Sequence, residues 1–305
     1  VQAYGRRAGP VIDWLHGLAA RLDRRIAVRL VKGAYWDAEI KRAQVLGLSD
    51  FPVFTRKVST DVSYVGLARK LLGMTGRIYP MFATHNAHTV AAVLDMARTS
   101  GLGNRDYEFQ RLHGMGENLH RIVQDDHGTR LRIYAPVGAH RELLAYLVRR
   151  LLENGANSSF VNQIVDEAIP PETVAACPLD ALDSLAQVEN MGLARGPSLF
   201  APQRENSAGV DLADRPTLTA LEAARAPFME RLDESGPILA AEAGEAAPAQ
   251  PVPNPATGAQ AGTVRDATPA QVSAAIDAAR PWTAPVVQRA ETLRRAADLY
   301  EANAL

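Results

Sequence analysis

Hydrophobic and polar residues recur with two different periods along the first half of the chain. Short apolar runs with the period of a strand predict β-strands, and stretches with apolar residues three and four apart predict helices. The predicted strands are Val1–Tyr4, Ile26–Val31, Ile78–Ala83, Tyr107–Leu112 and Arg130–Ala135. The predicted helices are Val11–Leu22, Asp37–Leu46, Val62–Leu72, Thr89–Ala97 and Asn118–Val123. Repeated strand and helix units favour an α/β fold with a parallel sheet.

The last of these strands leads through Pro136–Gly138 into a further helix that ends near Gly155. Its apolar face consists of Leu143, Leu144, Leu147, Val148, Leu151 and Leu152. Beside that face lie Arg149 and Arg150, whose planar guanidinium groups suit a carboxylate or a phosphate. Glu153 follows Arg149 by four residues, so from this stretch alone the pattern favours a solvated helix edge with one ion pair.

Polar residues at the ends of the predicted strands change this interpretation. They are Gln2, then Arg29 and Lys32, then Thr84, His85 and Asn86, then Gln110 and His113, then Tyr134. In a (βα)8 barrel the carboxyl ends of all strands meet at one mouth. A doubly wound sheet gathers only the residues at its switch point. Five successive polar strand ends therefore favour the barrel.

Composition narrows the class of protein. The chain has 305 residues, a formal net charge of −1 and 22% charged residues, which is an ordinary soluble composition with room for two domains and no sign of a nucleic-acid partner. No apolar run approaches the roughly 20 residues of a membrane helix, and no signal peptide is recognisable. The single cysteine, Cys177, fits a reducing compartment. No base stands at a recognisable offset from it, so we interpret it as a core or surface thiol rather than a nucleophile.

The sequence indicates neither a metal site nor one of the common nucleotide-binding loops. His85, His88 and His113 could imitate a zinc site, but no acidic partner stands at metalloprotease spacing, so we expect no metal. The glycine-rich patterns of the common nucleotide-binding loops are absent from the sequence.

Five motifs, in the same order, resemble the proline dehydrogenase domain of the bacterial proline utilization A family. They are R-L-V-K-G-A-Y-W-D (Arg29–Asp37), Y-P-M-F-A-T-H-N-A-H-T (Tyr79–Thr89), Y-E-F-Q-R-L-H-G-M-G-E (Tyr107–Glu117), R-I-Y-A-P-V-G (Arg132–Gly138) and Y-L-V-R-R-L-L-E-N-G-A-N-S-S-F-V-N (Tyr146–Asn162). The resemblance covers Val1–Ile169. It implies the C-terminal five units of a distorted (βα)8 TIM-like barrel that holds FAD and oxidises L-proline to Δ1-pyrroline-5-carboxylate.

The resemblance also implies roles for individual residues. Arg29 resembles the residue near flavin N5, and Arg149 and Arg150 resemble the pair that binds the proline carboxylate. Tyr134 and Leu112 would wall the proline ring, which makes Arg29 and Tyr134 the expected catalytic residues. Further flavin contacts would be Gln2, Lys32, Ala83, His85, Gln110 and Glu153, with Thr55, Lys57 and Thr60 at the adenine-side phosphates. The family's substrate lysine and aspartate come from earlier strands that this sequence does not include.

Beyond Ile169 the composition changes. Residues 170–253 are rich in Ala, Pro and Glu with weak helical patterns at Leu179–Val188 and Thr217–Leu232, which predicts a mostly helical connector. After Asn254 the sequence predicts a hairpin, then a helix opened by Thr268 and Pro269. Residues 254–305 resemble the start of an aldehyde dehydrogenase domain. In this family that domain converts glutamate semialdehyde to L-glutamate with NAD.

The missing initial methionine and the helical pattern running to Leu305 indicate a fragment. We expect the fragment alone to be inactive, because a barrel without its early strands has unpaired edges. The resemblance implies a cytoplasmic parent protein, peripherally membrane-associated when reduced. Its implied partners are L-proline, a quinone acceptor at the membrane surface, further copies in a homo-oligomer, and DNA only where an upstream repressor segment exists.

Two hypotheses of other kinds stay open on the residues alone. One is a non-catalytic carboxylate-binding barrel, and the other is a phosphate-using barrel lyase. A flavin spectrum that proline bleaches would distinguish the dehydrogenase from both.

Overall fold

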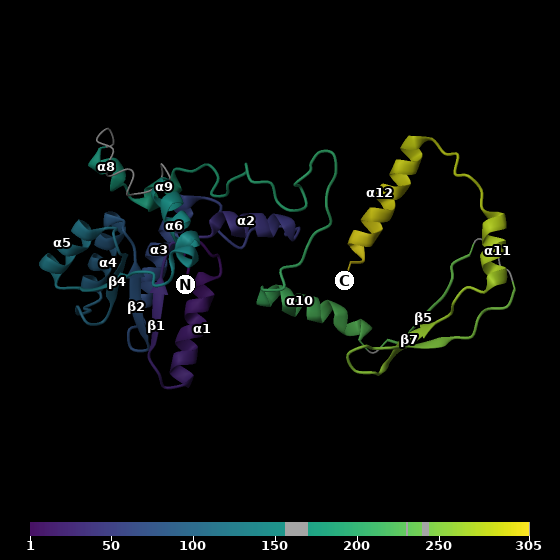
Figure 1. The fold of residues 1–305 in the computed structure, drawn as a ribbon, viewed down its shortest axis with the longest axis horizontal. Helices are drawn as coiled ribbons and strands as arrows, with labels where there is room; N and C mark the ends of the chain where they lie inside the picture. Colours follow the sequence, from purple (N-terminus) through teal and green to yellow (C-terminus); the bar gives the residue numbers. More distant parts are fainter. Residues whose placement is uncertain (156–169, 230, 240–243, 305) are drawn as a thin grey trace. The chain divides into compact units, whose positions relative to one another are not determined.

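The computed structural model describes residues 1–155, 170–229, 231–239 and 244–304, except for the side chains of His140, Pro171 and residues 150–155 (Figure 1). The chain forms two compact units, Val1–Asn206 and Ser207–Leu305. The boundary between them falls inside the range 170–253 for which the sequence predicts a connector.

A parallel sheet organises the first unit. Its strands are β1 (Ile26–Leu30), β2 (Ile78–Ala83), β3 (Glu108–Leu112) and β4 (Arg130–Tyr134). Their order in space is β1-β2-β3-β4, and each neighbouring pair is parallel. Gln2 forms a single parallel bridge to Val31, so the N-terminal residues lie beside the end of β1. The α/β fold with a parallel sheet is confirmed, and the described strands follow sequence order without the reversal that marks a doubly wound sheet.

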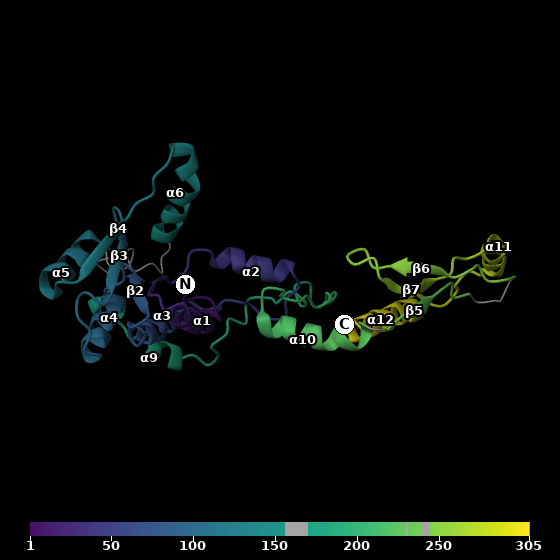
Figure 2. The same cartoon turned by 90° about the horizontal axis from the view of Figure 1, so that it is seen from below.

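Four helices cover one face of this sheet. The helices of the unit up to residue 155 are α1 (Ala8–Arg21), α2 (Trp36–Val45), α3 (Lys57–Leu72), α4 (Ala87–Thr99), α5 (Glu117–His127) and α6 (His140–Gly155). Apolar residues of α1, α3, α4 and α5, among them Ile12, Leu71, Val93 and Val123, form one core with Phe82 and other strand residues. Figure 2 shows α6 on the opposite side of the sheet from α1, α3 and α4.

Two expectations about this unit need correction. The predicted strand Val1–Tyr4 is reduced to the single bridge at Gln2. The predicted apolar face of α6 is not a buried face, because Leu144, Leu147 and Val148 are exposed. Helix α6 follows β4, the last strand of the sheet, and among the described residues no further strand lies beyond β4 to cover these side chains.

Residues 170–206 pack onto the first unit instead of leaving it as a free linker. They contain the short helices α8 (Pro171–Val174) and α9 (Pro178–Asp183). Leu193 packs against a second, smaller core that includes Ile40, Phe51 and Val53. The backbone N–H of Gly196 donates to the Leu48 carbonyl at 3.2 Å. The predicted helix Leu179–Val188 therefore ends five residues early, where the chain turns to run along the region of α2.

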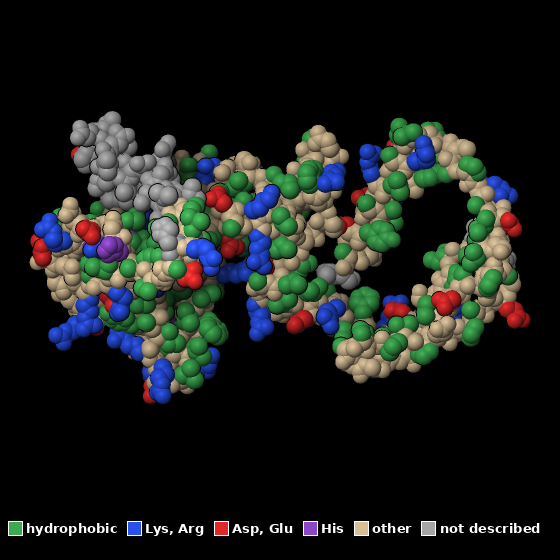
Figure 3. Space-filling model, in the orientation of Figure 1, with side chains coloured by type: hydrophobic (Ala, Val, Ile, Leu, Met, Phe, Trp, Pro, Cys, Tyr) green, Lys and Arg blue, Asp and Glu red, His purple; other side chains and the backbone are tan. Residues whose placement is uncertain are grey.

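The second unit is small and largely exposed. Its elements are α10 (Arg215–Arg225), η1 (Ala226–Phe228), β5 (Asp233–Ser235), β6 (Gln250–Pro253), β7 (Gln260–Val264), α11 (Pro269–Ala278) and α12 (Val286–Ala302). Strands β6 and β7 form a hairpin with Asn254 in its turn, so its first strand lies before the predicted start at Asn254. The Thr268 side chain caps α11 as predicted. Helix α10 ends earlier than the predicted Leu232. Apolar side chains such as Val286 and Leu293 lie exposed on α12, and hydrophobic surface is visible along this unit in Figure 3.

Candidate functional site

The two faces of the sheet differ in chemistry because side chains alternate along each strand. On β1, Val28 and Leu30 are buried in the core with the helices, whereas Arg29 between them lines a cavity. On β3, Phe109 belongs to the core, and Gln110 lines the cavity. The face away from the helices therefore carries the polar side chains.

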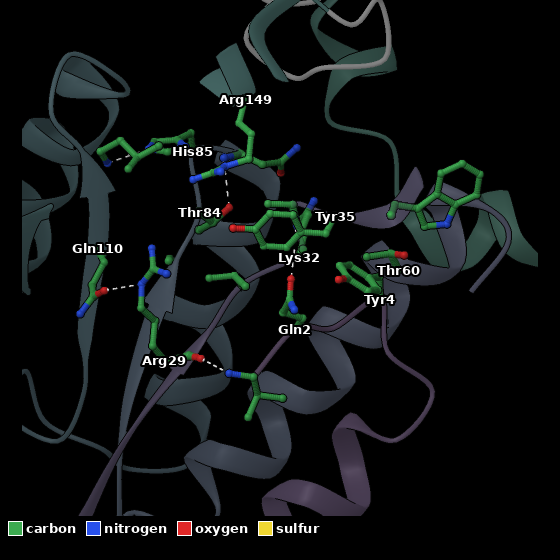
Figure 4. Close-up of a pocket in the computed structure, with 18 of the residues that line it drawn as sticks. Gln2, Tyr4, Arg29, Lys32, Tyr35, Thr60, Thr84, His85, Gln110 and Arg149 are labelled. Atoms are coloured by element: carbon green, nitrogen blue, oxygen red, sulfur yellow. Dashed lines mark hydrogen bonds between the residues drawn. The ribbon is translucent and has the colours of Figure 1, made fainter. Parts of the chain in front are cut away.

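This polar face and the strand ends enclose a cavity of about 890 Å³ (Figure 4). Twelve of the fourteen predicted site residues line it: Gln2, Arg29, Lys32, Thr55, Lys57, Thr60, Ala83, His85, Gln110, Leu112, Tyr134 and Arg149. They come from the N-terminal segment, the four strands and the loops that follow them, the chain just before α3, α3 itself and α6. The side chains of the other two, Arg150 and Glu153, lie outside the described residues. The expectation that separate strand ends meet in space is thus fulfilled for the residues described.

Arg29 of β1 lines the cavity. Its Nε donates to Gln110 Oε1 at 2.8 Å, and its guanidinium lies 5.4 Å from the centre of the Tyr134 ring. A guanidinium at this distance over an aromatic face is attracted by the ring's quadrupole. Arg29 is therefore held from two sides, and its permanent positive charge faces the cavity.

Glu108 continues this network on the same face of β3. Its Oε1 accepts from Gln110 Nε2 at 2.7 Å and from Arg132 Nε at 2.7 Å, and its Oε2 accepts from Arg132 Nη2 at 3.0 Å. Burial alone would raise the pKa of Glu108, but the hydrogen bonds from Arg132 and Gln110 outweigh it and hold the pKa below its ordinary value. Glu108 is therefore ionised at neutral pH.

Two lysines and an aspartate form a charged cluster at another part of the wall. Asp61 Oδ1 accepts from Lys32 Nζ at 2.5 Å, and Asp61 Oδ2 accepts from Lys57 Nζ at 2.8 Å. Burial lowers the pKa of Lys32, against the opposing pull of Asp61. For Asp61, burial would raise the pKa, but the two lysines outweigh it and lower it. The cluster carries one net positive charge and suits an anionic group.

Glycine is required next to this cluster. Gly33 has φ +136°, and a Cβ there would lie 1.5 Å from Cδ1 of Tyr4. Only glycine combines this backbone conformation with the absence of a side chain. The close approach lets the loop after β1 pass directly over the Tyr4 ring at the cavity wall.

His85 lies where the loop after β2 meets the end of β3. Its Nε2 accepts a hydrogen bond from the Leu112 backbone N–H at 3.0 Å, so the neutral ring carries its proton on Nδ1. Gly116, which has φ +63°, lies against the same ring. This arrangement fixes the orientation of the imidazole at the cavity wall.

Aromatic residues and Arg149 form the side of the cavity nearest α6. The Arg149 guanidinium lies 5.3 Å from the centre of the Tyr35 ring, and the Tyr134 and Tyr146 rings are 6.4 Å apart. A charged fork beside aromatic walls can hold a small molecule that carries a carboxylate and an apolar ring.

The sequence did not single out several residues of the cavity wall. Asp61 stands four residues after Lys57, and this spacing on a helix could have indicated it. Tyr35 and Trp36 lie within the motif Arg29–Asp37, but nothing in the sequence pattern indicates a role for their side chains. Trp36 Nε1–H donates to the Phe54 carbonyl at 2.7 Å, which ties the start of α2 to the chain before α3.

The described residues contain no group of three or more His, Cys, Asp or Glu side chains that could hold a metal ion. Cys177 is half-buried and directly precedes α9, outside the cavity lining. Among the described helices, none is both long enough and apolar enough to cross a membrane.

The fold and the cavity define an α/β protein with a polar cavity at the carboxyl ends of parallel strands. The sequence profile of the proline dehydrogenase family matches residues 1–163. The chain belongs to the proline dehydrogenase family.

Relatives extend the match beyond that domain. The Bifunctional protein PutA of Escherichia coli is 47% identical over 320 residues, which cover 99% of this chain and 24% of the relative. A crystal structure of a proline utilization A variant from Bradyrhizobium japonicum is 50% identical with a TM-score of 0.69, covering 79% of this chain and 24% of that one. A crystal structure of proline utilization A from Bdellovibrio bacteriovorus, inactivated by N-propargylglycine, is 28% identical with a TM-score of 0.70. The match covers 88% of this chain and 27% of that one. The chain therefore spans about a quarter of the length of these relatives.

Proposed function

We propose that this chain forms the flavin- and proline-binding part of an FAD-dependent proline dehydrogenase that oxidises L-proline to Δ1-pyrroline-5-carboxylate. The observation that carries the proposal is the convergence of twelve predicted site residues on one cavity. In this proposal the parallel strands belong to a closed, distorted (βα)8 barrel, and the cavity is its mouth.

The residues of the wall fit a flavin dinucleotide. Thr55, Lys57 and Thr60, with Lys32 beside them, offer cationic and hydroxyl donors for its phosphates. Gln2, Ala83, His85 and Gln110 would make further contacts with it. A bound flavin supplies an acceptor for the hydride that leaves the substrate.

The other end of the cavity fits proline. Arg149 would bind the carboxylate, and Leu112 and Tyr134 would hold the ring, so that the carbon beside the nitrogen faces Arg29. The fixed positive charge of Arg29 would stabilise the negative charge that a bound flavin gains on accepting the hydride. Roles for Arg150 in carboxylate binding and Glu153 in flavin binding are carried over from the family resemblance.

For the whole protein we propose the activities that its bifunctional relatives suggest. Residues 254–305 would begin an aldehyde dehydrogenase domain that oxidises the product further to L-glutamate with NAD. Residues 1–169 and 170–253 would be the dehydrogenase part and the connector. A quinone at the membrane surface as electron acceptor, homo-oligomers and a cytoplasmic location belong to this proposal, as does DNA where an upstream repressor segment exists.

The test uses the whole protein that contains this chain. We expect the purified protein to show a flavin absorbance spectrum that L-proline bleaches in the absence of oxygen. N-Propargylglycine should inactivate it, as with the Bdellovibrio bacteriovorus relative. A colourless protein that does not bind added FAD, or a flavin that proline fails to bleach, would overturn the proposal.

A further inference from the structure

Glu108 is a buried carboxylate on β3 to which the proposed reaction assigns no role. It is only 4% exposed, and its oxygens accept hydrogen bonds from Arg132, Gln110 and the Tyr79 hydroxyl, the last at 3.3 Å. Arg132, by contrast, is largely exposed. Burial of an ionised carboxylate is costly unless its lone pairs are used, and here both oxygens are occupied.

Glu108, Gln110 and Arg29 are joined in a row by hydrogen bonds, and the chemistry of their side chains determines how each is oriented. A carboxylate only accepts and a guanidinium only donates, so neither can reverse its part. Gln110 lies between them with one donating and one accepting end. Its Nε2 must therefore face Glu108 and its Oε1 must face Arg29, as the distances of 2.7 and 2.8 Å show. The Met81 sulfur, 3.1 Å from the same Nε2, supports this orientation.

We propose that Glu108 is a positioning residue, which acts through Gln110 to fix the guanidinium of Arg29 in the cavity. Arg132 of β4 holds the Glu108 carboxylate in place. The carboxylate orients the Gln110 amide, and the amide oxygen accepts the hydrogen bond from Arg29 Nε. The inference rests on the proposed function in one respect, namely that Arg29 faces the reacting atoms.

Replacing Glu108 by glutamine removes the acceptor-only carboxylate that holds the Gln110 amide in one orientation. Glutamine both donates and accepts, so the Gln110 amide can turn and present its NH₂ group to the donating Nε of Arg29. Hydrogen bonds to charged groups are the stronger ones, and networks of them are cooperative. We expect Glu108→Gln to slow flavin reduction by proline about tenfold to a hundredfold.

A double-mutant cycle in the whole protein tests the route of the effect. Glu108→Gln and Gln110→Ala should each slow flavin reduction, and Glu108→Gln should cost less than about threefold in the Gln110→Ala background. Additive effects would overturn the proposal, because a through-space charge effect or a loss of stability would persist without Gln110. Asp13→Asn is the matched control, since it breaks an ion pair with Lys70 between α1 and α3 outside the cavity. Asp13→Asn should leave the rate of flavin reduction unchanged both in the parent protein and in the Gln110→Ala variant.

Crystal structures supply a readout that does not depend on activity. Arg29 Nε should lie within hydrogen-bond distance of Gln110 Oε1 in the parent protein and lose this contact in Glu108→Gln. A retained contact would overturn the proposal even where no flavin is bound. Failure of the parent protein to bind flavin would instead count against the proposed function. If Glu108→Gln does not fold, Glu108→Asp keeps the charge but withdraws it by one methylene, and the same loss of the Arg29 contact is expected.

Discussion

Replacing Arg149 by methionine tests the proposed proline-binding end of the cavity. Methionine retains much of the length and apolar stem of arginine but removes the charged fork. In the structure Arg149 lines the cavity with its guanidinium 5.3 Å from the Tyr35 ring. Loss of a charged hydrogen-bond partner in a largely dehydrated site costs about 2–4 kcal/mol. Since 1.4 kcal/mol corresponds to a factor of ten, kcat/KM for proline should fall roughly 30- to 1000-fold.

Steady-state kinetics of the whole protein with a dye acceptor would measure this change, and titration with FAD would measure cofactor affinity. Arg149→Met should leave FAD affinity within about twofold, and Arg149→Lys should recover only part of the activity because lysine lacks the planar fork. Arg141, an exposed residue on the same helix and outside the cavity lining, provides the control: Arg141→Met should change neither quantity. A near-normal KM for proline in Arg149→Met would refute carboxylate binding by Arg149. It would favour the alternative that Arg149 only belongs to a solvated edge of the helix.

Three further predictions concern stability and the cysteine. Because the folded protein holds the pKa of Glu108 below its ordinary value of 4.5, the ionised carboxylate stabilises the fold at pH values above 4.5, and this stabilisation is lost as the pH falls further. The melting temperatures of the parent protein and Glu108→Gln should therefore differ at pH 6 and converge in acid. A difference that stays constant with pH would contradict this. Gly33→Ala should destabilise the protein by at least about 2 kcal/mol in denaturant unfolding, whereas Gly66→Ala, in the middle of α3 with open space around the new Cβ, should stabilise it by about 0.5–1 kcal/mol. Cys177→Ser should leave both activities of the whole protein within about twofold, and a large loss of either would show that this thiol matters.

The strands were predictable because each has an apolar side that must face the helices. The predicted bounds of β1, β2, β3 and β4 differ from the observed ones by at most one residue at either end. Helix α3 shows the limit of the same reasoning. It begins at Lys57, five residues before the predicted Val62, because its first turn faces the cavity and carries no apolar stripe.

That first turn also explains which site residues the sequence could not reveal. A polar residue after an apolar strand is conspicuous, so Lys32, His85 and Gln110 could be identified from their positions. Asp61 lies on a helix, where a charged residue is ordinary, and only the packing of α3 against the end of β1 brings it to Lys32. Tyr35 is equally ordinary in sequence, and its role depends on α6 bringing Arg149 to it across the cavity.

One row of hydrogen bonds joins polar side chains from three strands of the sheet. Arg132, Glu108, Gln110 and Arg29 form a continuous row of hydrogen bonds across β4, β3 and β1, and Gln110 also contacts Met81 of β2. The row exists because parallel register places Gln110 opposite Arg132 on β4 and opposite Ala83 on β2, with side chains of alternate residues on one face. A slip of one residue in β3 would send Glu108 and Gln110 into the apolar core and Phe109 into the cavity. The apolar residues that pack against the helices therefore also fix which charged side chains face the cavity, so the same alternation that specifies the fold positions Arg29.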